Sequence, residues 1–585
     1  MLAGCGVIPT ASDFSYTPPP QPEGASGYTA KPGWKTASFA VAAANPLATD
    51  AGFQVLKAGG SALDAAIAVQ MVLTLVEPQS SGIGGGAFLM HFDGKAVEAY
   101  DGRETAPAAA DENLFVKADG KPMSFIEGVV GGRSVGVPGT VRMLEMAHRR
   151  HGKLPWAALF KPAIVLAEQG FRLSPRLNAL LASEQHLKKD PEAAAYFYDA
   201  GGKPWPVGHL LRNPELARVL RAIAAQGSKA LLEGPVAEAI VAKVRSHPTN
   251  PGVLTAADLA GYQPRKREPL CHDYGTPPAR AYRLCGFPPP SSGALAIGQI
   301  VGILQNTPGA SLPLGADGLP GADWLHFYTE AARLAFADRA QYVADPDFVA
   351  APAGSWLSLL SPDYLAERAK LIGDQSMKLA RPGQPQAART SFAPMPEQPE
   401  HGTSHISVVD ARGRAVAMTT TIEAAFGARQ MVNGFLLNNE LTDFSYAPRD
   451  AQGNPIANRV QPGKRPRSSM SPTLVFDKAS GELLMSGGSP GGALIIHYTA
   501  KTLWGTLNWG LDAQKAIDLP NFGSTNGPTL LEQKRFPAAT VQALKARGHE
   551  VREMDMTSGL QAIQRVPGGL FGGADPRREG IVMGD

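Results

Sequence analysis

The sequence predicts an α+β fold in which antiparallel strands form the core and helices cover it. Three stretches in the last third of the chain carry strand-forming residues on both sides of a Gly-containing turn, which is typical of β-hairpins. They are TSHISVVDARGRAVAMTTTI, turned at Arg412-Gly413, TLVFDKASGELLMSGGS, turned near Ser480-Gly481, and QAIQRVPGGLFGGAD, turned at Pro567–Gly569. Long helical patterns at residues 140–250 and 326–342 flank these hairpins.

The composition is that of a globular enzyme with many loops. Of the 585 residues, 44% are hydrophobic and 18% are charged, with 64 glycines and 50 prolines. The net charge of +3 is too small to indicate nucleic acid or a membrane surface as a partner. The most apolar stretch, ALDAAIAVQMVLTLVEP, contains Asp64 and Gln70 and is too short to span a bilayer, so we expect a buried core helix.

The first residues resemble a lipoprotein cleavage motif. MLAGCG places Leu2, Ala3 and Gly4 before Cys5, but only Met1 stands where a basic and apolar leader belongs. Either the start is assigned too late or the match is chance, and we favour the late start. Residues 1–32 are expected to form a Pro-rich tether.

The other two cysteines leave two alternatives open. Cys271 and Cys285 flank CHDYGTPPARAYRLC, whose Gly and Pro centre predicts two antiparallel strands. They form either a disulfide across those strands or two free buried thiols.

A glycine-rich stretch follows two helices expected within residues 44–78, which Gly59-Gly60 separates. SGIGGGAF matches a dinucleotide-binding fingerprint, but that fingerprint needs a strand before it and a helix after it. Here a helix precedes it, and FLMHFDGKAVEAYDGRE, a hairpin turned at Asp93-Gly94, follows. We therefore predict a tight backbone turn near a site.

Two motifs offer a hydrolase nucleophile. GGSPG at residues 487–491 matches GxSxG between a strand and a helix, with His497 and His549 downstream. In such an elbow the residue after the nucleophile donates its N–H to the oxyanion, but here that residue is Pro490, which has none. Ser489 is therefore the weaker candidate.

The second candidate is Thr403, which opens the first hairpin after a Pro-, Ala- and Gly-rich approach. A Thr hydroxyl needs a base beside it to act as a nucleophile. If the chain is cut between Gly402 and Thr403, the new α-amino group, with a pKa of about 7.7–8.0, can be that base. The same hydroxyl can make the cut by attacking the Gly402 carbonyl, which a glycine leaves sterically open.

Many motifs in a fixed order make the chain similar to the γ-glutamyltranspeptidases, which are N-terminal nucleophile hydrolases. The resemblance runs from about residue 38 to the C-terminus and rests on NPLATDAGFQVLKAGGSALDAAIA, EPQSSGIGGGAF, DGRETAP, VPGTV, PPPSSGA, TSHISVVD, LLNNELTDFS, KRPRSSMSPT, GSPGG and GADPR. It implies a four-layer αββα fold shared by a large chain, residues 33–402, and a small chain, residues 403–585, that are cut from one precursor.

The resemblance also implies roles for individual residues. Thr403 would be the nucleophile for self-cleavage and for turnover, and Thr421, at the end of the same hairpin, would orient its hydroxyl. Gly491 and Gly492 would donate backbone N–H groups to the oxyanion at the start of a helix, whose N-terminal partial charge would help. GSPGG would then be an oxyanion loop and not a nucleophile elbow.

The implied substrate is a γ-linked glutamate, whose α-carboxylate and α-ammonium groups need opposite charges. Arg103 is expected to bind the carboxylate, with Ser468 and Ser469 as hydroxyl donors. Asp443 is expected to bind the ammonium group. The residues expected around that group are Asn439, Glu440 and Glu423.

Three positions depart from the family pattern. Glu423 and Glu440 stand where some members have amides, so the ammonium end is more acidic and should not suit acyl groups without an amine. Arg467 precedes the serine pair where an apolar residue is common. It either attracts acidic acceptors or leaving groups, or is a plain solvent-exposed charge.

Three functions remain at this point. The first is self-cleaving transfer of γ-glutamyl groups from glutathione and related amides to water, amino acids or peptides. The second is an acylase for glutaryl-type β-lactam side chains or an enzyme acting on poly-γ-glutamate, although Asp443 argues against a dedicated acylase. The third is an uncut, non-enzymatic binding protein. HExxH and Walker motifs are absent from the sequence, so we expect no metal or cofactor.

The resemblance and the Cys5 motif together favour a periplasmic or cell-envelope location, with a lipid anchor at Cys5, over a mature cytoplasmic protein.

Overall fold

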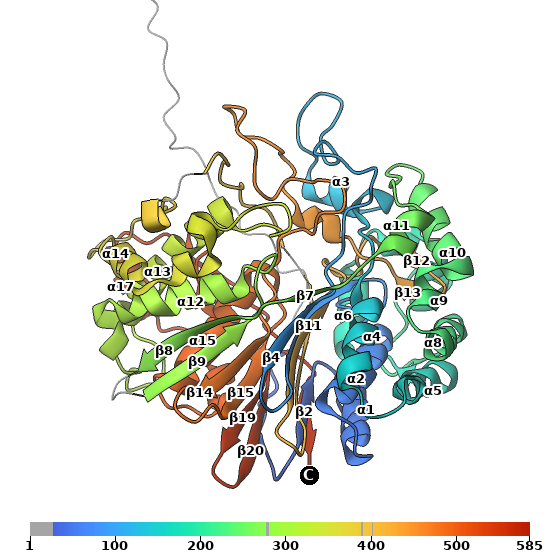
Figure 1. Ribbon diagram of the computed structural model, residues 1–585, viewed down its shortest axis with the longest axis horizontal. Helices are drawn as coiled ribbons and strands as arrows, with labels where there is room; N and C mark the ends of the chain where they lie inside the picture. Colours follow the sequence, from blue (N-terminus) through green and yellow to red (C-terminus); the bar gives the residue numbers. More distant parts are fainter. Residues whose placement is uncertain (1–26, 277–279, 388–389, 401) are drawn as a thin grey trace, which may run out of the picture.

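Two stacked seven-stranded sheets form the centre of the fold (Figure 1). The computed structural model describes residues 27–585 apart from 277–279, 388–389 and 401. Cys5 and most of the predicted tether therefore lie outside the described residues. In both sheets every neighbouring pair of strands is antiparallel, as the sequence predicted.

Sheet I consists, in spatial order, of β21 (Ile581–Gly584), β2 (Ala40–Ala43), β10 (Ser404–Val409), β11 (Ala415–Thr421), β3 (Gly86–Phe92), β4 (Val97–Asp101) and β7 (Arg265–Arg267). Sheet II consists of β1 (Trp34–Thr36), β20 (Gly569–Ala574), β19 (Gln561–Val566), β15 (Leu483–Gly488), β14 (Thr473–Asp477), β9 (Arg280–Gly286) and β8 (Leu270–Thr276). Smaller sheets pair β5 (Phe171–Arg172) with β6 (Leu210–Leu211), β12 (Met431–Val432) with β13 (Phe435–Leu436), and β16 (Phe522–Gly523) with β17 (Thr529–Glu532) and β18 (Val551–Met554).

Alternation along the central strands separates the two faces of sheet I. Val41 and Ile406 belong to the apolar cluster that includes α1 and α2, whereas Ala42 and Ala417 belong to the cluster between the sheets. Strands β2 and β11 contribute alanines to this inner cluster, whereas β3 contributes the larger Phe88, Met90 and Phe92. Strands β10 and β11 are buried along their whole length, which holds the start of β10 in a rigid setting.

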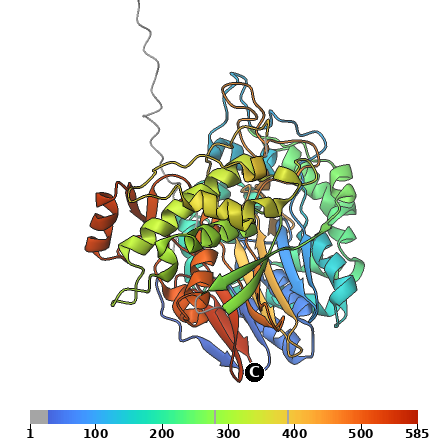
Figure 2. The same cartoon turned by 60° about the vertical axis from the view of Figure 1, so that its left-hand side comes forward.

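Helices cover the outer face of each sheet (Figures 1 and 2). On the side of sheet I lie α1 (Pro46–Lys57), α2 (Ala62–Val76), α4 (Thr140–His151), α5 (Lys161–Gln169), α6 (Pro175–Ser183), α8 (Pro214–Gln226) and α10 (Gly234–Arg245), with the short helices α7 (Pro191–Phe197), α9 (Lys229–Leu232) and α11 (Ala256–Gly261). The short helix α3 (Phe125–Val129) instead contacts the 3₁₀ turn Glu440–Asp443. On sheet II lie α12 (Gly293–Gln305), α13 (Ala322–Tyr342), α14 (Pro362–Ala369), α15 (Ile495–Leu507), α16 (Ala513–Asp518) and α17 (Ala538–Ala546). The four-layer αββα arrangement is therefore confirmed.

Helix α2 is the buried core helix that the sequence predicted. Ser61 and Asp64 cap its start, each side chain accepting a backbone N–H of the other residue. The Asp64 carboxylate also accepts the N–H groups of Lys153 and Leu154, so this buried charge has partners. Among the described residues we find no helix with the length and apolar character needed to cross a membrane.

The predicted hairpins are confirmed. Strands β10–β11, β14–β15, β19–β20 and β3–β4 pair around the expected turns. The glycine-rich stretch follows helix α2 and leads into strand β3. A dinucleotide fingerprint needs the opposite order, a strand before it and a helix after it.

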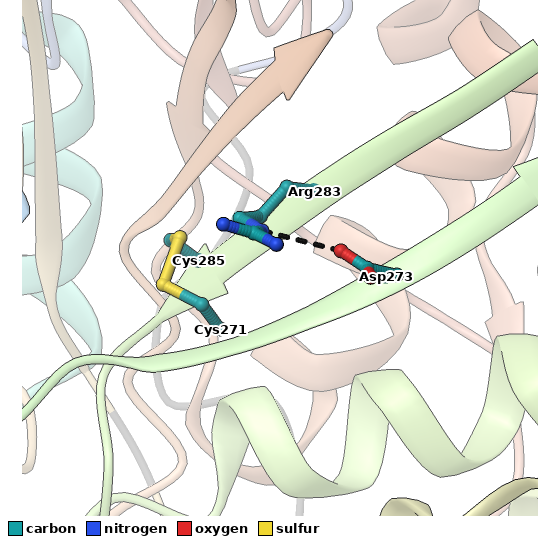
Figure 3. The surroundings of a disulfide bond; sticks show 4 residues. All are labelled: Cys271, Asp273, Arg283 and Cys285. Carbon is teal, nitrogen blue, oxygen red and sulfur yellow. Dashed lines mark hydrogen bonds and ion pairs between the residues drawn. A yellow bond between two sulfur atoms is a disulfide. The ribbon is translucent and has the colours of Figure 1, made fainter. Parts of the chain in front are cut away.

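A disulfide joins Cys271 and Cys285 across β8 and β9, which excludes the alternative of two free thiols (Figure 3). The next cross-strand pair on the same face, Asp273 and Arg283, forms an exposed ion pair at 3.2 Å. Because β8 is the edge of sheet II, the disulfide fastens a strand that has only one neighbour.

Replacing both cysteines (Cys271→Ser with Cys285→Ser) is expected to lower the free energy of unfolding by about 2–3 kcal/mol, because the disulfide closes a short loop in the unfolded chain. Urea unfolding followed by tryptophan fluorescence measures the change. The control is Asp273→Asn with Arg283→Gln, which removes only the exposed pair and should cost at most about 1 kcal/mol. An unchanged midpoint in the cysteine variant would show that the disulfide contributes nothing.

Candidate active site

Thr403 immediately precedes β10, and its hydroxyl lies against the peptide bond that joins it to Gly402. Its Oγ1 donates to the Gly402 carbonyl oxygen, and Thr421 Oγ1 donates to the same oxygen at 3.0 Å. The Glu423 N–H donates to Thr421 Oγ1 at 2.7 Å and orients that hydroxyl. Because Ser404 pairs with Thr420 in the β10–β11 ladder, the next residues, Thr403 and Thr421, lie side by side where the ladder ends.

Two glycines allow this close approach. Gly402 has φ +34°, and a Cβ at this position would lie 2.1 Å from the Glu423 carbonyl oxygen. A Cβ on Gly85 would lie 2.0 Å from the Thr421 carbonyl oxygen. The glycine-rich stretch is therefore a turn packed against the end of β11, as predicted.

Arg103, which follows β4, is buried, and each nitrogen of its guanidinium group donates a hydrogen bond. Its Nη2 donates to Asp443 Oδ2 at 2.5 Å and to the Arg467 carbonyl at 2.8 Å, its Nη1 donates to Glu440, and its Nε donates to the Pro466 carbonyl at 3.1 Å. Burial would lower the pKa of Arg103, but Glu440 and Asp443 outweigh burial and raise it. The sequence placed Arg103 and Asp443 at opposite ends of a substrate, whereas in the uncut chain they pair with each other.

Buried carboxylates outnumber the guanidinium group at this end of the site. Burial, together with Glu440 and Glu400, raises the pKa of Asp443 to about 8 although Arg103 lowers it. Burial also raises the pKa values of Glu104 and Glu440. Within the described part of the chain Asp443 Oδ1 has no hydrogen-bond partner. A further cation, such as an ammonium group, would therefore be stabilised here.

The serine pair contacts two residues that the sequence analysis missed. Ser469 Oγ accepts from Arg339 Nη2 at 2.7 Å and donates to Glu400 Oε2 at 2.5 Å. Ser292 Oγ donates to the Ser468 carbonyl oxygen at 2.8 Å, which fixes the backbone of the pair. Arg339 lies on α13, whose pattern indicated only packing, and Glu400 lies in the Pro-, Ala- and Gly-rich segment before Thr403.

A small cavity shows which predicted residues the fold brings together. Its volume is about 10 Å³, room for about one water molecule, so the uncut chain fills its own site. The cavity is lined by Arg103, Glu400, Thr403, Thr421, Glu440, Asp443, Ser468, Ser469, Met470, Gly492 and Ile495.

Four predicted residues do not line this cavity: Gly402, Glu423, Asn439 and Gly491. Asn439 Nδ2 donates to Glu423 and to Thr442 Oγ1, and Asn439 Oδ1 accepts from the Ala424 N–H at 2.9 Å, so Asn439 and Glu423 brace the loop behind Asp443. Gly491 does not line the cavity, although the next residue, Gly492, does.

The proposed oxyanion loop has the backbone that glycines permit. Gly491 has φ +132° and Gly492 has φ +59°, both in the left-handed range. A short 3₁₀ turn, Gly492–Leu494, then leads into α15. The N–H of Gly492 therefore belongs to the start of a helical segment at the cavity wall.

Arg467 is buried, so the alternative of a plain solvent-exposed charge is wrong. Burial and the neighbouring Arg339 lower the pKa of Arg467 to about 9. A guanidinium group in this position needs an anionic partner.

Ser489 has the surroundings of a structural residue. Its Oγ donates to the Pro490 carbonyl at 2.7 Å and accepts the Gly559 N–H at 3.3 Å. The two downstream histidines bond elsewhere: His497 Nδ1 to the Tyr328 hydroxyl and His549 Nε2 to His326. In the part of the chain that the structure describes, neither histidine is placed as a base for Ser489.

His326, Glu330 and His549 gather ligand-type atoms within reach of one another. His326 Nδ1 and His549 Nε2 share a hydrogen bond of 2.8 Å, and Glu330 Oε1 accepts from Arg333 at 2.6 Å. Each of these three side chains therefore has a hydrogen-bond partner within the chain.

Known proteins resemble this chain over most of its length. A family model described as Gamma-glutamyltranspeptidase matches residues 48–585. The glutathione hydrolase proenzyme of Bacillus subtilis (strain 168) is 36% identical over 561 residues, which cover 93% of this chain and 91% of that protein. The corresponding Escherichia coli (strain K12) proenzyme is 34% identical over 92% of this chain and 90% of its own length. Among solved structures, a cephalosporin acylase from Bacillus halodurans matches with a TM-score of 0.80 at 28% identity, covering 99% of both chains.

The raised pKa of Asp443 gives the uncut chain a pH-dependent stability. Because the folded-state pKa exceeds the unfolded value, the contribution of Asp443 is fully present below about pH 4 and is lost as pH rises to about 8. We expect the unfolding temperature of Thr403→Ala, chosen to keep the chain in one piece, to fall across this range. Adding Asp443→Asn should flatten the dependence, whereas adding Asp119→Asn, an exposed carboxylate, should not. Equal slopes in both double variants would contradict this assignment.

Proposed function

The chain belongs to the γ-glutamyltranspeptidase family, and from this premise we propose that it is a self-cleaving γ-glutamyltransferase and glutathione hydrolase with Thr403 as nucleophile. The observation that carries the proposal is the Gly402 carbonyl oxygen, which accepts from the hydroxyl groups of both Thr403 and Thr421. A nucleophile and a hydrogen-bond donor for the developing oxyanion thus meet at one peptide bond.

Self-cleavage uses this arrangement directly. Attack of Thr403 Oγ1 on the Gly402 carbonyl carbon forms an ester and breaks the peptide C–N bond, and the hydroxyl proton ends on the released nitrogen. Thr421 Oγ1 donates to the oxygen that becomes negative. Water then hydrolyses the ester, leaving a carboxylate on Gly402 and a free hydroxyl and α-amino group on Thr403. The products are a large chain that ends at Gly402 and carries the predicted tether before residue 33, and a small chain, residues 403–585.

Turnover repeats the chemistry on a γ-glutamyl amide. The α-amino group of Thr403, with a pKa of about 7.7–8.0, takes the proton from its own hydroxyl. The hydroxyl attacks the γ-carbonyl, Gly491 and Gly492 donate N–H groups to the oxyanion, and the leaving amine takes the proton. Water or an amino acid acceptor then attacks the γ-glutamyl ester on Thr403.

Substrate recognition follows from the charges that already meet in the uncut chain. Arg103 and Asp443 form an ion pair at 2.5 Å. A γ-glutamyl donor inserted between them would replace this ion pair by two: its α-carboxylate with Arg103 and its α-ammonium group with Asp443. The open Oδ1 of Asp443 supports this assignment of the ammonium end.

The second candidate, a glutaryl-type acylase, is supported by the match to a cephalosporin acylase. A glutaryl group has no amine for Asp443, so the buried carboxylates would have no cation to gain. We therefore place γ-glutamyl amides first.

The disulfide between Cys271 and Cys285 supports a location in the cell envelope, because such bonds persist in oxidising compartments. Lipid attachment at Cys5 stays a prediction.

Thr403→Ala should remain whole and inactive, because the hydroxyl that cuts the chain and attacks the substrate is gone. The parent should split into pieces of about 42 and 19 kDa, in proportion to their lengths, and should hydrolyse γ-glutamyl-p-nitroanilide. A denaturing gel and the release of nitroaniline measure both properties. An uncut parent that still turns over the anilide would exclude the α-amino group as base.

Asp443→Asn tests the choice between glutamyl and glutaryl substrates. We expect kcat/KM for γ-glutamyl-p-nitroanilide to fall about 10- to 100-fold, since a charged hydrogen bond to the ammonium group is lost. The value for glutaryl-p-nitroanilide should not fall, and Asp450→Asn should change neither. A parent that prefers the glutaryl anilide would favour the acylase function instead.

A further inference from the structure

Glu400 is held in the uncut chain as a bound carboxylic acid would be. Arg339 Nη2 donates to its Oε1, and Ser469 Oγ donates to its Oε2 at 2.5 Å, so each carboxylate oxygen has a separate donor. Arg467 Nη2 lies 3.7 Å from Oε1 and adds a second positive charge. Burial would raise the pKa of Glu400, but the charges of Arg339 and Arg467 outweigh it and lower the pKa.

This carboxylate lies in the cavity that contains Thr403. Glu400 lines it together with Arg103, Asp443 and the serine pair. The chain just before it is anchored, because Gln398 Nε2 donates to the Thr442 carbonyl at 2.7 Å. Glu400 stands two residues before Gly402, so cleavage at Gly402–Thr403 makes it part of a new chain end that can leave.

The donors that hold Glu400 are also fixed without it. Arg339 Nε donates to Ser292 Oγ at 2.8 Å, and its guanidinium lies 5.4 Å from the centre of the Phe336 ring. Ser292 in turn holds the Ser468 carbonyl. When Glu400 leaves, a preorganised site remains with two buried cations, Arg339 and Arg467, and an open hydroxyl at Ser469. Such a site needs a carboxylate.

We propose that Arg339 and Ser469, assisted by Arg467, bind the α-carboxylate of the γ-glutamyl donor, and that Glu400 fills this place until the chain is cut. This inference rests on the proposed function. It adds Arg339 to the carboxylate-binding residues expected from the sequence and makes Glu400 an internal surrogate for the substrate. It also explains why Arg103 can remain bonded to Glu440 and Asp443 in the uncut chain.

The test combines an enzyme variant with a substrate that lacks the carboxylate. L-γ-Glutamyl-p-nitroanilide and 4-aminobutyryl-p-nitroanilide differ only in the α-carboxylate. Arg339→Gln is expected to lower kcat/KM for the first donor about 10- to 100-fold and to leave the second within about 3-fold, because only the first loses a charged hydrogen bond. Equal losses on both donors would overturn the proposal, since a merely structural role affects both.

Three further variants test for a general loss of structure. Arg333→Gln removes another buried guanidinium of α13, one that pairs with Glu330 and does not line the cavity. Any loss it causes should be the same for both donors. Arg339→Lys should recover part of the glutamyl-specific loss. If Arg339→Gln stays uncut on a gel, Arg467→Leu takes its place in the test. Its loss in kcat/KM should be smaller and still confined to the glutamyl donor. Equal losses on both donors would overturn the proposal.

A binding measurement separates this inference from the proposed function. Calorimetry with L-glutamate and with 4-aminobutyrate, on parent and Arg339→Gln protein, needs no turnover. A parent that releases no nitroaniline, yet binds glutamate in an Arg339-dependent way, would refute the proposed function and retain the carboxylate site. If the parent turns over the anilide, yet parent and Arg339→Gln protein bind glutamate equally well, the proposed function would stand and the carboxylate site would be refuted.

The uncut chain tests the role of Glu400 itself. In the Thr403→Ala background, Glu400→Gln should lower the unfolding temperature more than Glu397→Gln does, because Glu400 neutralises two buried arginines, whereas Glu397 is exposed. The two residues lie in the same segment, and both carboxylates accept a hydroxyl hydrogen bond. Equal shifts would show that Glu400 is no more than an ordinary anchor.

Discussion

The contact between the Thr403 hydroxyl and the Gly402 carbonyl is the interaction around which the candidate active site is arranged. It exists because β10 is held between β2 and β11 in a register that places Thr421 beside Thr403. The register is set by the hairpin turn and by burial of both strand faces, since a shift by one residue would invert every side chain. Gly85 and Gly402 give the backbone the space that this approach requires.

Charge balance gives the uncut protein its second constraint. A site built for a zwitterionic amino acid carries buried cations and anions that are costly to leave unpaired. Before cleavage the chain neutralises them with its own groups: Glu400 faces Arg339 and Arg467, and Arg103 faces Asp443. The filled cavity and the raised pKa of Asp443 both follow from this arrangement. Cutting the chain would then create the nucleophile's amine and release the carboxylate that occupies the site.

The sequence predicted those parts of the structure that depend on local pattern. The hairpin turns, the α2 core helix and the turn at Gly85 follow from periodicity and glycine placement, and the structure has them. Most residues that the family resemblance implied meet at one cavity, although Gly402, Glu423, Asn439 and Gly491 do not line it. Arg339 and Glu400 were missed because they come from a helix with an ordinary packing pattern and from a segment without any pattern. Arg467 was left open because burial depends on tertiary contacts that no local pattern encodes.

The most direct test of the account is the mass and sequence of the small chain after a brief reaction with a γ-glutamyl donor and an acid quench. The account predicts a fragment that begins at Thr403 and gains the mass of one γ-glutamyl group, with the added mass on the peptide that contains this first residue. A γ-glutamyl group on the peptide that contains Ser489, or turnover without a fragment that begins at Thr403, would contradict it.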